Sequence, residues 1–198
     1  FIGKQASLSN RTALESFRLA PEMIARIDDE RLAAELLAVC LELARHSVKH
    51  SGELLAESPA VVAHLRRIDQ SGVLAHRATA VASAMAHRSG GTATDFFKKI
   101  PTALRSDDVA SITQLLDETE QYLDRSGSVA LQYFVAGGAI LQSADADTYA
   151  RWSELTRAVA LHSNAATYHY LKFSPVVIGE LRRREAAAGT GLVLGVLE

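Results

Sequence analysis

The chain is poor in cysteine, proline and aromatic residues. Its 198 residues include one cysteine, four prolines and 6% aromatic residues. The single cysteine, Cys40, excludes an intrachain disulfide framework, and we expect a reducing, cytoplasmic location. Because the apolar content is mostly alanine and leucine, with few aromatic residues, the composition favours helices over strands.

A strong net charge, a long apolar run and the common catalytic motifs are also missing. The formal net charge of −2 offers no attraction to nucleic acid or to anionic membranes. No apolar run approaches the roughly 20 residues that a membrane helix needs. The H-E-x-x-H, G-x-S-x-G and C-x-x-C motifs are absent. We therefore predict a protein without enzymatic activity, cofactor or membrane association, and we do not expect it to bind nucleic acid.

What the chain does contain is an internal repeat. Its prolines and one glycine mark five copies, at Pro21, Pro59, Pro101, Gly138 and Pro175. The successive spacings are 38, 42, 37 and 37 residues. A serine stands twelve residues before each marker, at Ser9, Ser47, Ser89, Ser126 and Ser163. A large apolar residue stands four before it, at Phe17, Leu55, Phe97, Phe134 and Leu171. Another apolar residue stands three after it, at Ile24, Val62, Leu104, Leu141 and Ile178.

Each copy predicts a pair of helices. We expect first helices at about 29–46, 71–87, 107–123 and 145–162, each followed by a second helix that contains the marker. In the helix at 107–123, one face carries Ile112, Leu115, Leu116, Thr119 and Tyr122. Its acidic residues Asp117, Glu118 and Glu120 are expected to face solvent.

Proline inside a second helix removes one backbone donor and disfavours helical geometry just before it. The sequence therefore predicts either a bent second helix or a break, at Ser58-Pro59 and at Ser174-Pro175. A break would give three helices to each repeat, as in armadillo units. The residues leave both alternatives open.

A period of 37 to 42 residues with two helices in each copy resembles HEAT and armadillo-like repeats. The resemblance covers nearly the whole chain. It implies an all-α, right-handed α-solenoid over residues 1–198, with about four full units and a partial first one. Because neither end shows the polar capping unit that such arrays usually have, we expect the chain to be a segment of a longer protein.

A narrower resemblance involves Trp152, the Ser174-Pro175 step and Leu181. These residues, in their helix-turn-helix context, resemble the helical regions that precede a von Willebrand A domain in proteins that partner MoxR-type AAA+ ATPases. The resemblance implies an adaptor role with an AAA+ ATPase as partner. The resemblance is to the helical region and not to the A domain itself, so metal binding by that domain is not implied.

Helical arrays of this kind present extended surfaces that bind other proteins. We therefore expect a protein-binding scaffold, whose contact residues depart from the repeat pattern or form short basic runs. These are Tyr168, His169, Arg66, Arg67, Lys98 and Lys99. A nucleic-acid-binding or processing module and a structural spacer within a larger protein are the alternatives. His46, His50 and Glu53 have the spacing of a metal site, but a basic residue recurs at the position of His46, which favours a structural role.

Overall fold

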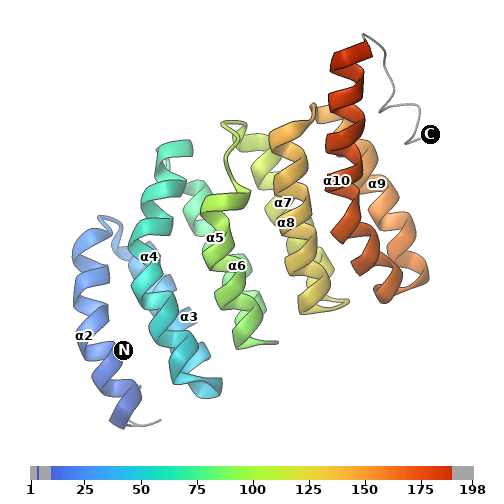
Figure 1. Cartoon of the computed structure of the whole chain (residues 1–198). Helices are drawn as coiled ribbons and strands as arrows, with labels where there is room; N and C mark the ends of the chain where they lie inside the picture. Colours follow the sequence, from blue (N-terminus) through green and yellow to red (C-terminus); the bar gives the residue numbers. More distant parts are fainter. Residues whose placement is uncertain (1–3, 5–9, 189–198) are drawn as a thin grey trace. The chain divides into compact units, whose positions relative to one another are not determined.

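The computed structural model describes residue 4 and residues 10–188, and this part of the chain is helical throughout, apart from short connections (Figure 1). It contains no strand, so the predicted all-α class is confirmed. The helices are α2 (Asn10–Arg26), α3 (Glu30–His46), α4 (Val48–Ile68), α5 (Val73–Ala86), α6 (Gly90–Ala103), α7 (Val109–Leu123), α8 (Gly127–Ser143), α9 (Ala146–His162) and α10 (Asn164–Ala188).

The chain packs as two compact units, Phe1–Thr102 and Ala103–Glu198. In the first unit, α3 packs against both α4 and α5, and α2 packs against α4. In the second unit, α8 packs against both α7 and α10, and α9 packs against α10 and α8. Each unit therefore combines helical hairpins with contacts between the second helices of successive hairpins. No helix within residues 10–188 is long and apolar enough to cross a membrane.

The four predicted first helices are confirmed as α3, α5, α7 and α9. Three of them begin after an aspartate that accepts hydrogen bonds from backbone N–H groups of the first turn. Asp29 accepts from Leu32 at 2.9 Å, and Asp145 accepts from Thr148 at 2.8 Å. The third, Asp108, caps α7 in the same way. Such a cap satisfies a donor that has no partner in the helix and places negative charge at its positive end.

The repeated serines cap three of the second helices. The Oγ atoms of Ser47, Ser89 and Ser163 accept from backbone N–H groups three residues later, at 3.5, 3.4 and 3.3 Å. Ser126 also precedes a helix, but its hydroxyl lies 2.8 Å from that of Ser128 and makes no backbone cap. Ser9 lies outside the described residues. The recurring serine is thus mainly a helix-start signal.

The apolar repeat positions form the core. Leu55, Phe97, Phe134 and Leu171 are fully buried. The side chain of the fifth member, Phe17, lies outside the described set. The predicted face of α7 is also confirmed, because its five residues from Ile112 to Tyr122 are all buried. Three residues after the marker, Val62, Leu104 and Ile178 are buried. Ile24 departs from the pattern, with an exposed side chain.

Of the two alternatives at the prolines, a bent helix or a break, the break is wrong. Both α4 and α10 continue through their proline without interruption. A proline inside a helix costs about 3 kcal/mol. Around Pro59 the helix buries Leu55 and Val62, and each such side chain contributes about 1.5–3 kcal/mol. The packing of one unbroken helix therefore offsets the lost backbone bond.

The glycine that replaces proline in the fourth copy has a packing function. A Cβ atom added at Gly138 would lie 2.5 Å from the carbonyl oxygen of Ala103, the first residue of the second unit. The neighbouring Gly137 leaves no more room, since its Cβ would lie 2.5 Å from the side chain of Leu115. Only glycine permits this close approach of backbones.

We expect Gly138→Ala to lower the free energy of unfolding by about 1–3 kcal/mol. The added methyl group would clash with backbone atoms of Ala103, which cannot move without disturbing the surrounding packing. Gly179→Ala is the matched control, since a Cβ there meets nothing within 4 Å. It should raise stability by about 0.5–1 kcal/mol, as expected for glycine to alanine in an open helix position. Urea unfolding measures the change in the free energy of unfolding of each variant relative to wild type. A stabilising Gly138→Ala would contradict the packing of Gly138 against Ala103.

Candidate functional site

Helix α10 has one buried and one open apolar face. Thr167, Leu171, Ser174 and Ile178 point into the second unit and are almost fully buried. Ser174 is fixed there because its hydroxyl accepts a 2.8 Å hydrogen bond from Nε1 of Trp152. The opposite side carries Phe173, which is 57% exposed, and Val177, which is 50% exposed. Apolar side chains one helical turn apart are thus left open to solvent.

These open side chains line a groove of about 430 Å³ between α9 and α10. We call it the α9–α10 groove. Its lining residues are Leu155 from α9 and, from α10, His169, Tyr170, Phe173, Ser174, Val177, Ile178 and Leu181. Apolar and aromatic side chains dominate the lining. An exposed patch of this kind typically marks a place where another molecule binds.

Of the two residues predicted from their departure from the repeat, one lies in this groove. His169 lines it. Tyr168 is 38% exposed, and its ring meets that of His169 edge-on, with centroids 6.1 Å apart. Tyr170, which the repeat assigns to the core, is half-buried and also lines the groove. Burial raises the pKa of Tyr170 to about 12, so its hydroxyl stays protonated at neutral pH.

The four predicted basic contacts lie in the first unit, apart from this groove in the sequence. Lys98 on α6 bonds to Glu53 at 2.8 Å, and Arg67 on α4 contacts His64 at 3.2 Å. Lys99 is exposed. The Lys98–Glu53 bond raises the pKa of the lysine and lowers that of the glutamate. The structure therefore does not gather the six predicted contact residues into one site.

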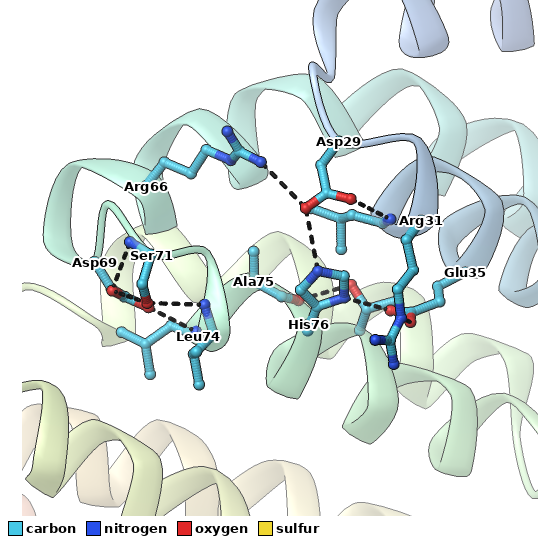
Figure 2. A network of polar contacts seen from close by, with 12 residues as sticks. Asp29, Arg31, Glu35, Arg66, Asp69, Ser71, Leu74, Ala75 and His76 are labelled. Atoms are coloured by element: carbon cyan, nitrogen blue, oxygen red, sulfur yellow. Dashed lines mark hydrogen bonds and ion pairs between the residues drawn. The ribbon is translucent and has the colours of Figure 1, made fainter.

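The fourth of these basic residues, Arg66, belongs to a polar network that joins α3, α4 and α5 (Figure 2). Its guanidinium lies 3.4 Å from Oδ2 of Asp29. His76 bridges two carboxylates, with Nε2 3.2 Å from Asp29 and Nδ1 2.8 Å from Glu35. The cap bond from Leu32 is the main reason why the pKa of Asp29 lies below its usual value, and His76 and Arg66 reinforce it. These contacts join residues of α4 and α5 to α3 and to the aspartate that precedes it.

The histidines with metal-like spacing have separate carboxylate neighbours. Nε2 of His46 lies 3.7 Å from Glu42, and Nδ1 of His50 lies 3.9 Å from Glu53. Within residues 10–188, no group of three histidine, cysteine or acidic side chains is placed to hold a metal ion. The thiol of Cys40 is buried, and burial raises its pKa well above the usual range.

The expectation that Glu118 faces solvent is wrong. This carboxylate is almost fully buried in the second unit. It accepts hydrogen bonds from the hydroxyl groups of Tyr133 at 2.5 Å, Tyr149 at 2.9 Å and Ser153 at 3.0 Å. The side chains of Gln114 and Arg157 also donate to it, at 3.1 and 2.5 Å. A buried charge is tolerated when it is paired and hydrogen-bonded in this way.

Aromatic rings surround this carboxylate. Tyr133 stacks on Tyr122 with centroids 4.4 Å apart and on Trp152 at 5.0 Å. Tyr149 lies 5.7 Å from Trp152. The stack joins α7, α8 and α9, while Trp152 reaches α10 through Ser174. Trp152 and Ser174, which carry the narrower family resemblance, are thus in direct contact as part of the core.

No family model, no curated protein and no solved structure matches this chain.

Only some of the residues that line the groove were predicted from the sequence. His169 was predicted because it departs from the repeat, whereas Phe173 and Val177 were not predicted. Their spacing of one helical turn, beside His169, was the available signal. Glu118 carried no such signal, since most of its donors are distant in the sequence.

The buried carboxylate predicts a specific pH dependence of stability. Burial alone would raise the pKa of Glu118, but the hydrogen bonds from Tyr133, Gln114 and Tyr149 outweigh it, so the pKa lies below 4.5. The stability that Glu118 contributes is therefore present above about pH 4.5 and lost as the pH falls through the lowered folded value.

We expect Glu118→Gln to lower the free energy of unfolding by about 2–3 kcal/mol at pH 7, because charge-assisted hydrogen bonds are lost. The difference from wild type should shrink as the pH falls below about 4.5. Urea unfolding of both proteins between pH 7 and pH 3 measures it. A difference that stays constant over this range would show that the charge of Glu118 does not stabilise the fold.

Proposed function

We propose that the protein is a non-catalytic protein-binding module and that the α9–α10 groove binds its partner. The observation that carries the proposal is the apolar lining of this groove, in which Phe173 and Val177 are exposed. Leaving these side chains in water has an energetic cost, which burial against a partner would recover at about 25 cal/mol per Å² of apolar surface.

An amphipathic helix of another protein is the occupant that the groove suits best. The groove runs along α10, and its anchors recur at one-turn spacing from His169 through Phe173 and Val177 to Leu181. Helices bind in such grooves by laying their own apolar stripe against them. Phe173 and Tyr170 provide the aromatic contact area that binding hot spots commonly use.

We further propose that the helical pairs belong to a HEAT/armadillo-like α-solenoid. The repeat registers and the contacts between successive second helices inside each unit support this arrangement. The resemblance around Trp152 makes an AAA+ ATPase one candidate partner. Nucleic acid is less favoured, because Arg66, Lys98 and Arg182 are paired with acidic side chains.

The test uses two adjacent valines of α10. Val177 lines the groove and is 50% exposed, whereas Val176 is 71% exposed and does not line it. We expect Val177→Asp to abolish partner binding, because a charge in the groove would be desolvated without a counterion. Val176→Asp should leave binding unchanged.

Affinity capture with wild type and both variants, followed by quantitative mass spectrometry, measures the effect. The proposal requires at least one protein that wild type and Val176→Asp retain and Val177→Asp loses. Thermal melts of the three proteins check that each is folded. Equal retention by the two variants would contradict a role of the groove.

A further inference from the structure

A second concave site in the same unit lies at the C-terminal ends of α7 and α9. It is a pocket of about 440 Å³, within the range typical of small-ligand sites. Its lining residues are Gln121, Tyr122, Arg125, Arg157, Ala158, Ala160 and Leu161. None of them lines the α9–α10 groove, so the two sites can be tested separately.

One of the lining residues, Tyr122, has a buried hydroxyl group without a partner. Tyr122 is 6% exposed, and its hydroxyl oxygen has no hydrogen-bond partner among the described residues. Leaving a buried hydroxyl unpaired destabilises a fold, and phenylalanine would fill the same volume without that cost. Burial raises the pKa of Tyr122 to about 12. At neutral pH the group is therefore a proton donor that lacks an acceptor.

Two guanidinium groups line the same pocket. Arg125 donates to the carbonyl oxygen of Ala160 through one nitrogen, which leaves further N–H groups of its planar fork. Arg157 donates to Glu118 and keeps 54% of its side chain exposed. Because a guanidinium carries five N–H donors, Arg157 can bond a ligand through the others and keep its bond to Glu118.

The charges select the kind of anion. Of the two guanidinium groups among the lining residues, that of Arg157 is already paired with Glu118, which favours a monoanion over a dianionic phosphate. The fork of arginine fits the two oxygens of a carboxylate. Ala158, Ala160 and Leu161 add an apolar wall, which suits a carboxylate attached to an apolar group.

We propose that this pocket binds a carboxylate attached to a small apolar group, with Arg125 and Arg157 as charge partners and the Tyr122 hydroxyl as an additional donor. Such a group can be a free organic acid or an acidic side chain of a protein partner. Both have the same recognition chemistry. Because the hydroxyl is buried, a bound carboxylate reaches it only when a neighbouring side chain moves aside.

The test is an NMR titration of the ¹⁵N-labelled chain with two probes. Benzoate represents a free organic acid, and N-acetyl-leucyl-glutamate amide represents an acidic protein side chain. Benzamide is the neutral control. We expect saturable shifts at the ends of α7 and α9 with at least one carboxylate probe and none with benzamide. The tighter of the two probes identifies the source of the natural ligand.

Three variants assign the roles. Arg125→Gln should weaken binding at least about tenfold, since a charge-assisted bond contributes on the order of a factor of ten or more. Tyr122→Phe should weaken it about threefold to tenfold while leaving the melting temperature equal or higher. Arg184→Gln, which changes an exposed arginine that pairs with Glu180 outside the pocket, should bind like wild type.

The proposal is overturned if neither carboxylate shows saturable binding, or if benzamide binds equally well. It is also overturned if Tyr122→Phe lowers the melting temperature and binds like wild type, because the hydroxyl would then serve the fold alone. None of these results bears on the α9–α10 groove, whose test depends on Val177.

Discussion

The structure depends on one constraint: each helix carries an apolar stripe that its hairpin partner alone does not cover. In the second unit α8 packs against α7 on one side and α10 on the other. Where two backbones must come closest, glycine replaces proline at Gly138. Where a neighbour is absent from the described residues, as along Phe173 and Val177, the stripe remains open. Packing and the candidate binding surface thus have the same physical origin.

The second unit also depends on a polar interaction inside its core. Glu118 gathers donors from α7, α8 and α9. A buried carboxylate is costly unless its oxygens are satisfied, so these side chains must keep one arrangement together. The aromatic stack of Tyr122, Tyr133 and Trp152 lies along the same helices. This fixed core holds the walls of both concave sites.

Much of the fold was predictable because its signals are local. Serine before a helix start and apolar residues at helical spacing both act within one or two turns. The first helices and the buried positions Leu55, Phe97, Phe134 and Leu171 followed from them. The burial of Glu118 could not be predicted in this way, since Tyr133, Ser153 and Arg157 contact it only after α8 and α9 have packed. The exposure of Phe173 and Val177 could not be predicted, because an apolar stripe predicts burial whether or not a neighbouring helix covers it.

The central claim is that the α9–α10 groove holds a helix of a partner protein. Photo-crosslinking from a reactive residue placed at position 173, compared with the same residue at position 176, tests it most directly. We expect an adduct from position 173 that maps to one amphipathic helix of one protein and is absent from position 176. Identical adducts from both positions, or none from position 173, would contradict it.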